Sequence, residues 1–132
     1  MKLLYDTNVV FDVIERRTPH YFASLQMLKL AQRGTVEAAL ASHTVANIFY
    51  QYQKAIIPDL KSRFLNDFEI VCGDANLVRA SLNLGFSDLE DALQVAAALA
   101  WKSAFIITRN ERDFKRSPIP AISPSAYLKR FH

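Results

Sequence analysis

Three short clusters of acidic and polar residues in this sequence stand where an apolar segment begins or ends. The first consists of Asp6, Thr7 and Asn8, and it follows the apolar run Lys2–Tyr5, which has the composition of a short buried strand. In an open α/β sheet, ligands gather outside the carboxyl ends of the strands. A carboxylate at position 6 therefore faces a crevice and not the core, which makes Asp6 the first candidate site residue.

The second cluster consists of Asp88, Glu90 and Asp91, at the start of a predicted Ala-rich helix. At about 100° per residue, Asp88 and Asp91 share one side of that helix and Glu90 points elsewhere. Asp91 is followed by Ala-Leu-Gln-Val-Ala-Ala-Ala, so it stands where the apolar, packed part of the helix begins. Its carboxylate is therefore held at the rim of the core.

The third cluster follows Ala104–Ile107, a continuous apolar run that is typical of a central parallel strand. The strand closes with Thr108, Arg109 and Asn110, and Asp113 comes three residues later. Polar residues thus end this predicted strand as they end the first one.

Side chains of this kind suit Mg²⁺ or Mn²⁺, which prefer carboxylate and carbonyl oxygens and keep several waters. A cation held in this way binds a scissile phosphate and activates an attacking water. The residues needed for a zinc site are not present in a recognisable pattern, because His20, His43 and His132 are scattered along the sequence. The sequence also has no G-x-S-x-G element and no Gly-rich phosphate loop.

Each cluster also has a purely structural interpretation. Asp, Thr and Asn dominate turns and helix N-caps, and acidic residues in a first helical turn complement the helix dipole. A single cluster does not separate these interpretations from a functional one, so only the occurrence of the clusters together indicates a site.

Hydrophobic periodicity and capping residues predict strands and helices that alternate along the chain. We expect strands at Lys2–Tyr5, Thr35–Ala41, Glu69–Cys72, Ala104–Ile107 and Ile119–Ile122. We expect a first helix directly after Asp6, with Thr7 or Asn8 near its N-cap, a second from Pro19 to about Arg33 with Thr18 as N-cap, and a third from Val45 to about Ala55 with Ser42, His43 or Thr44 as caps. Four more helices are expected from Pro58 to Phe68, from the cap Asp74 to Gly85, from the cap Ser87 or Asp88 to about Lys102, and from Pro124 to Phe131. Such alternation implies a parallel sheet covered on both faces, in which the first and fourth strands lie side by side.

Size and composition favour one compact domain over residues 1–132, long enough to bury a core without disulfides. The chain is 51% hydrophobic with only 3 Gly, which argues against disorder. Cys72 is the single cysteine and fits a reducing compartment. No apolar stretch approaches the ~18 residues that span a bilayer, and no signal-peptide pattern is present. We therefore expect a cytoplasmic protein with no membrane association; its net charge of +3 permits a polyanionic partner without demanding one.

Four short motifs, taken in order, give the sequence a resemblance to the PIN-domain family, which includes the ribonuclease toxins of bacterial toxin-antitoxin pairs. The motifs are Tyr5–Asn8, Ser42–Asn47, Asp91–Ala98, and Ile107–Asn110 with Asp113-Phe114, and they cover nearly the whole chain. The resemblance implies a three-layer α/β/α sandwich with a central, mostly parallel sheet, and Mg²⁺- or Mn²⁺-dependent cleavage of RNA by an acidic cluster. By position, Asp6 and Asp91 match the metal-binding aspartates, and Asn110 and Asp113 match the fourth polar or acidic position.

One position departs from the family pattern. The family commonly has Glu in the third helix, where this chain has Asn47. Asn still offers a carbonyl oxygen to a hard cation but brings no negative charge, which lowers the expected metal affinity. Glu90, beside Asp91, is a candidate to compensate for it, and Asn8, Asp88 and Thr108 are further candidate site residues.

The resemblance also implies partners: RNA as substrate, a homodimer, and, for a toxin, a small antitoxin protein that blocks the site. Arg109 and Arg112 are the candidate RNA contacts among the basic residues that follow strand ends or lie in the adjoining loops. Two alternatives remain open. One is a phosphoryl-accepting α/β domain, which would need a second acid beside Asp6, where this chain has Thr7 and Asn8 instead. A non-catalytic PIN-like module that binds RNA or a partner is the stronger alternative, because Asn47 weakens the acidic cluster.

Overall fold

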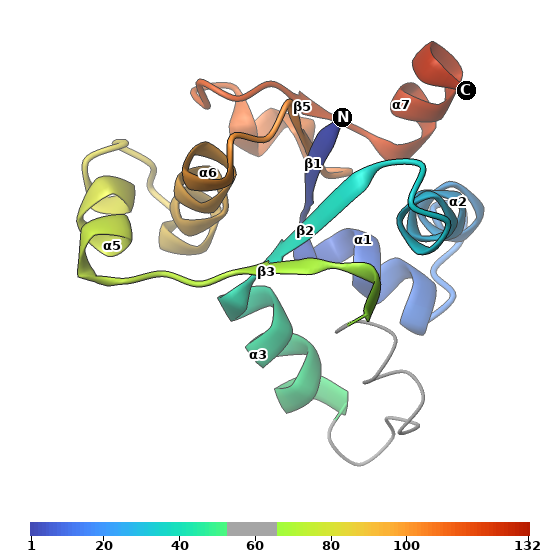
Figure 1. Cartoon of the computed structure of the whole chain (residues 1–132), viewed down its shortest axis with the longest axis horizontal. Coiled ribbons are helices and arrows are strands. Elements are labelled where there is room, and N and C mark those ends of the chain that lie inside the picture. The colour runs from blue at the N-terminus through green and yellow to red at the C-terminus, as the bar shows by residue number, and fades with distance from the viewer. Residues whose placement is uncertain (53–65) are drawn as a thin grey trace.

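The computed structural model describes residues 1–52 and 66–132, and its centre is a parallel sheet of five strands in the order β3-β2-β1-β4-β5 (Figure 1). The strands are β1 (Lys2–Tyr5), β2 (Glu37–Ala41), β3 (Glu69–Val71), β4 (Phe105–Ile107) and β5 (Ala121–Ile122). The helices are α1 (Thr7–Ile14), α2 (Tyr21–Gln32), α3 (Ser42–Tyr52), α5 (Ala75–Leu82), α6 (Leu89–Trp101) and α7 (Pro124–Phe131), with a short 3₁₀ helix η1 (Glu111–Phe114). All five predicted strands are present, and β1 pairs with β4 as expected.

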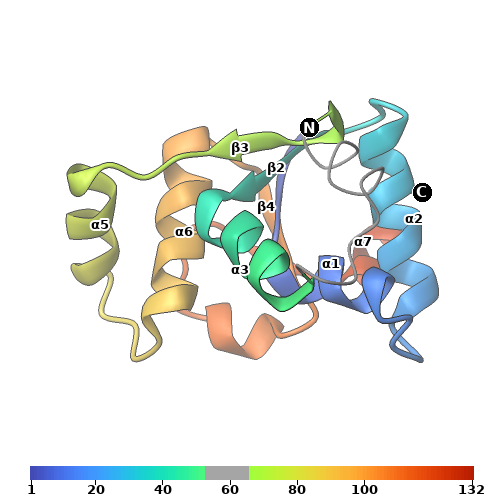
Figure 2. The ribbon, with the colours of Figure 1, turned by 90° about the horizontal axis from the view of Figure 1, so that it is seen from below.

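The helices cover the sheet on both faces, which confirms the predicted three-layer α/β/α architecture. α5 and α6 lie on one face, and α1, α2 and α7 lie on the other (Figures 1 and 2). α3 follows β2 without a break and extends beyond the carboxyl edge of the sheet, next to the start of α1.

β1 lies in the middle of the sheet, and its side chains alternate between the two faces. Leu3 and Tyr5 belong to the core under α1, α2 and α7, whereas Leu4 belongs to the core under α6. All three side chains are completely buried. Because both faces of the strand are covered, the first polar residue after Tyr5 marks the point where the chain leaves the core.

Several element boundaries differ from the prediction. α1 is capped by Asp6 itself, whose side chain accepts a hydrogen bond from the Thr7 N–H, and not by Thr7 or Asn8. α2 begins at Tyr21 with His20 as a cap that makes no side-chain bond, so the predicted Thr18 cap is wrong. α3 already begins at Ser42, which places the predicted capping residues within the helix. η1 was not predicted, and the helix expected from Pro58 lies largely outside the described residues.

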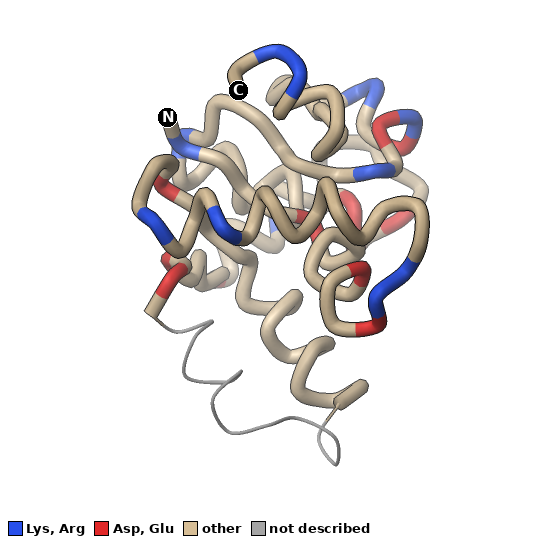
Figure 3. The backbone as a smooth tube through the Cα atoms, turned by 90° about the vertical axis from the view of Figure 1, so that its right-hand side faces the viewer, with Lys and Arg blue, Asp and Glu red and all other residues tan. Residues whose placement is uncertain are grey.

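Charged residues are distributed unevenly over these elements. α3 carries none, and it appears as a plain tan helix in Figure 3. The start of α6 carries Glu90 and Asp91, and the C-cap of the same helix is Lys102.

Within residues 1–52 and 66–132, no helix is long and apolar enough to cross a membrane.

Candidate active site at the carboxyl edge of the sheet

Asp6 stands at the junction of β1 and α1, at the carboxyl end of the central strand. Its backbone N–H donates to the Ile107 carbonyl at 2.8 Å, so residue 6 is still aligned with β4. Its backbone is extended and its side chain caps α1, which turns the carboxylate back toward the helix N-terminus. The N–H groups and the dipole of α1 favour a negative charge at this place. The strand-to-helix junction therefore fixes the position of the carboxylate.

Four hydrogen-bond donors surround the Asp6 carboxylate, which is only 8% exposed. Oδ1 accepts from the Thr7 N–H at 2.8 Å and from Gln94 Nε2 at 3.1 Å. Oδ2 accepts from Thr108 Oγ1 at 2.8 Å and from Asn8 Nδ2 at 3.2 Å. A carboxylate that receives four donors has all of its lone pairs in use, which is the arrangement suited to the ionised group.

A buried polar network extends from Asp6 into α3 and α6. Gln94 Nε2 lies 2.9 Å from Thr44 Oγ1 and 3.3 Å from Thr7 Oγ1, and the two hydroxyls are 2.8 Å apart. Gln94 and Thr44 are fully buried. Sequence reasoning did not select Gln94 or Thr44 as site residues, although one amide in the otherwise apolar run after Asp91 is a signal that points to a buried polar partner.

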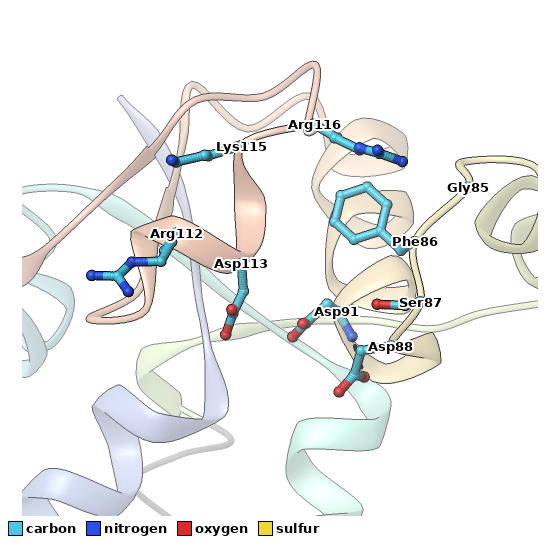
Figure 4. A pocket seen from close by; sticks show the side chains of 9 residues that line it. All are labelled: Gly85, Phe86, Ser87, Asp88, Asp91, Arg112, Asp113, Lys115 and Arg116. Carbon is cyan, nitrogen blue, oxygen red and sulfur yellow. Dashed lines mark hydrogen bonds between the residues drawn. The ribbon is translucent and has the colours of Figure 1, made fainter.

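Asp88, Asp91 and Asp113 line a pocket of about 650 Å³ between the start of α6 and η1. In Figure 4 the carboxylates of Asp91 and Asp113 face one another across this pocket. Asp88 is the N-cap of α6, and its Oδ1 accepts from the N–H groups of Glu90 at 2.8 Å and Asp91 at 3.1 Å. Asp88 thus serves to cap the helix, whereas the side chains of Asp91 and Asp113 point into the pocket.

The charges of these acids act on one another. Burial, together with the charges of Glu90 and Asp113, raises the pKa of Asp6 to about 6 against the opposing hydrogen bonds from Thr108 and Thr7. Partial burial also raises the pKa of Asp91 to about 6, with contributions from Asp88, Asp6, Asp113 and Glu90. Two carboxyls whose ionisation is disfavoured by neighbouring negative charge are functional-site candidates, and a cation between them relieves the repulsion.

Asn47 faces Glu90 in the structure. Its Nδ2 donates to Glu90 Oε1 at 3.0 Å, joining the middle of α3 to the first turn of α6. Glu90 is exposed, and its charge raises the pKa of both Asp6 and Asp91. The position that departs from the family pattern is therefore adjacent to an acid that acts on the same two aspartates.

The residues after β4 divide into buried and exposed positions. Thr108 is fully buried and bonds Asp6, and it accepts from the Asn110 N–H at 3.1 Å. Arg109 Nε donates to both oxygens of Asp12, at 3.1 and 2.9 Å, and Asp12 is completely buried. Arg109, which is partly exposed, thus has a buried acid as the partner of its Nε, and its predicted contact with RNA stays a prediction.

Basic residues also line the pocket. Arg112, Lys115 and Arg116 come from η1 and the turn that follows it, and Arg112 extends away from Asp91 and Asp113 (Figure 4). All three are exposed and available to a polyanion. Arg17 instead pairs with Glu15 near the end of α1.

The residues at this edge fit a divalent cation through one or two carboxylates. Over residues 1–52 and 66–132, no group of three or more His, Cys, Asp or Glu side chains is arranged to hold a metal ion. Mg²⁺, however, is commonly held by one or two carboxylates with waters in the remaining positions. The side-chain groups of Asp6, Asp91 and Asn8 that could bind the cation are oxygens, and Asn8 Oδ1 is buried without a hydrogen-bond partner. The donor chemistry and the raised pKa values of Asp6 and Asp91 both suit a hard cation.

Comparison with known protein families identifies the one to which this chain belongs. The model of the PIN domain matches residues 2–112. The chain therefore belongs to the PIN-domain family, which confirms the resemblance found in its motifs. No curated protein is significantly similar to the chain in sequence.

Solved structures of low sequence identity share the fold. A toxin-antitoxin complex from Klebsiella pneumoniae matches with a TM-score of 0.73 and 24% identity, over 92% of this chain and 97% of that one. VapBC2 from Rickettsia felis, bound to a DNA fragment from its promoter, matches with a TM-score of 0.67 and 22% identity, over 93% and 98%. FitAcB from Neisseria gonorrhoeae matches with a TM-score of 0.70 and 17% identity, over 93% and 98%.

Proposed function

We propose that the protein is a divalent-metal-dependent endoribonuclease that hydrolyses RNA phosphodiester bonds with Mg²⁺ or Mn²⁺. The observation that carries the proposal is the meeting of Asp6 and Asp91 at one edge of the sheet. They are 85 positions apart in the sequence, and burial, with neighbouring negative charges, raises the pKa of each. Family membership and the oxygen-only donor set support the same conclusion.

Asp6 and Asp91 are the residues that would hold the cation, which when bound acts as a Lewis acid on the scissile phosphate and lowers the pKa of an attacking water. Thr108 donates to Oδ2 of Asp6 and fixes the rotation of the carboxylate. Asp113 lies across the pocket from Asp91 and, with Asn110 at the start of η1, orients substrate and water by hydrogen bonding.

The exposed basic residues of the pocket complete the substrate site. Arg112, Lys115 and Arg116 bind phosphates on either side of the cleaved bond, because exposed Arg and Lys neutralise backbone charge without reading sequence. Arg109 has no such role in this proposal, since Asp12 engages its guanidinium.

The biological role we propose is that of the toxin in a toxin-antitoxin pair. The fold is shared with proteins described as a toxin-antitoxin complex and as VapBC2, which supports an antitoxin protein as partner. A homodimer follows from the same resemblance and is tested by light scattering of the purified chain. One observation favours a second candidate, a PIN-like module that binds RNA or a partner without cutting: α3 supplies Asn47 and no acid.

The test is cleavage of an end-labelled single-stranded RNA by protein stripped of metal. Wild type should cut with Mn²⁺ or Mg²⁺ restored and should not cut in EDTA. Asp6→Asn and Asp91→Asn should abolish cleavage while both variants remain folded by circular dichroism. Glu37→Gln, an exposed acid at the opposite end of β2, serves as the matched control and should cut like wild type. Cleavage that persists in EDTA or in both aspartate variants would refute the proposal, and RNA binding without cleavage under all conditions would favour the non-catalytic module.

A further inference from the structure

The two carboxylate oxygens of Asp6 differ in the solvent exposure of their hydrogen-bond partners. Oδ1 is held by the Thr7 N–H and by Gln94, and both residues are buried. Oδ2 is held by fully buried Thr108 and by Asn8, which is partly exposed. The Asn8 contact, at 3.2 Å, is the longest of the four. A cation arriving from solvent can therefore displace the Asn8 amide from Oδ2, whereas Oδ1 stays engaged on the inner side.

The amide of Gln94 is oriented by Asp6. Its Nε2 lies within hydrogen-bond distance of three acceptors, Asp6 Oδ1 and the hydroxyls of Thr7 and Thr44. Its Oε1 is buried and has no hydrogen-bond partner. The opposite orientation would let Oε1 accept from one of the two hydroxyls but would place it against Asp6 Oδ1, acceptor against acceptor. The observed orientation is the one that a carboxylate at position 6 requires.

We propose that Gln94 is a positioning residue that ties Oδ1 of Asp6 to the interior, so that Asp6 offers a divalent cation only Oδ2. This inference rests on the proposed function, because it concerns the same cation. It adds a residue from the middle of α6 that touches neither metal nor substrate.

A carboxylate restricted to one oxygen discriminates between cations. Ca²⁺ takes six to eight oxygen ligands and commonly uses both oxygens of a carboxylate, whereas Mg²⁺ requires near-octahedral geometry with single oxygens and waters. By engaging Oδ1, Gln94 disfavours the two-oxygen mode that Ca²⁺ uses. Removing the amide leaves Oδ1 with the Thr7 N–H alone and opens that mode.

The test is calorimetric titration of Mn²⁺, Mg²⁺ and Ca²⁺ into metal-stripped wild type, Gln94→Met and Gln94→Leu. Both replacements keep the side-chain length or volume and remove the donors. The matched control is Gln26→Leu, an exposed glutamine on α2. Thr44→Val removes a bond to Gln94 without touching Asp6. Thermal unfolding confirms that each variant is folded.

In both Gln94 variants the preference for Mn²⁺ over Ca²⁺ should fall about tenfold, the change expected when one charge-assisted contact becomes available. Thr44→Val should shift the preference in the same direction by less, and Gln26→Leu should match wild type. Folded Gln94 variants with the wild-type preference overturn the inference and leave the proposed function standing. Should neither Gln94 variant fold, Thr44→Val decides. A wild-type protein that binds none of the three cations overturns the proposed function, and the inference with it.

Discussion

Replacing Asp6 by Asn should change how the stability of the protein depends on pH. The Asp6 carboxyl is 8% exposed and its pKa is raised to about 6, first by burial and then by the charges of Glu90 and Asp113. A raised pKa means that the folded protein binds the proton more tightly than the unfolded chain does. The stability that protonated Asp6 contributes is thus fully present below the ordinary pKa of 3.8 and is lost as the pH rises through about 6.

The magnitude follows from the two pKa values. The difference between about 6 and 3.8 corresponds to about 3 kcal/mol, at about 1.4 kcal/mol for each pH unit. Between about pH 4.5 and 7.5 the wild type should lose about 2 kcal/mol of this, because the unfolded carboxyl is already partly ionised at the lower pH. The amide of the Asp6→Asn variant has no proton to release, and any cost of rearranged hydrogen bonds at Thr108 is the same at both pH values.

The assay is urea unfolding of wild type and Asp6→Asn in EDTA at the two pH values. The free energy of unfolding of the variant, relative to wild type, should rise by about 2 kcal/mol from about pH 4.5 to 7.5. The control Glu37→Gln should differ from wild type by less than about 0.5 kcal/mol at either pH. A difference between Asp6→Asn and wild type that does not change with pH would refute the reasoning about the buried carboxylate.

Two further substitutions test contacts around the site. Asn47→Glu replaces the amide that donates to Glu90 with a third carboxylate. In calorimetry the variant should bind Mn²⁺ more tightly than wild type, and in EDTA it should unfold at a lower temperature because the added charge is not neutralised. Unchanged affinity and stoichiometry would place Asn47 outside the metal site. Arg109→Gln should lower the free energy of unfolding by about 3 kcal/mol, because it leaves buried Asp12 without its cation. Adding Asp12→Asn should recover part of that loss, and a simple sum of the two single effects would argue against the ion pair. The exposed control Arg17→Gln should cost less than about 1 kcal/mol.

The fold was predictable because local signals agree with it along most of the chain. Lys2–Tyr5 and Pro124–Phe131 coincide with β1 and α7, since an apolar run with a polar end and a Ser-Pro start are strong local patterns. Gly34, with a φ of +70°, follows the C-cap Arg33 of α2, where a left-handed backbone favours glycine. The start of α2 was mispredicted because a Thr-Pro pair is compatible with a cap but equally with the turn found here, which leaves His20 in the capping position.

The site was only partly predictable, because hydrogen bonds between distant segments leave weak traces in sequence. Asp6 and Asp91 were selected because acids beside apolar segments stand out in the sequence, and their role in binding a metal stays a prediction. Gln94 was not selected, since a single amide in an apolar part of a helix indicates a buried polar partner but not which residue provides it. The pairing of Arg109 with Asp12, 97 positions away, was missed because the side-chain direction after a strand end cannot be inferred locally. The roles of Asn110, Asp113 and Arg112, like those of the other candidate site residues, remain predictions.

The central claim is that Asp6 and Asp91 together hold a divalent cation, and anomalous diffraction from crystals soaked in Mn²⁺ tests it most directly. We predict one manganese peak within bonding distance of Oδ2 of Asp6 and of a carboxylate oxygen of Asp91, and no peak there in crystals of Asp91→Asn. A well-ordered carboxyl edge without a peak, or manganese bound only at other surface acids, would contradict the account.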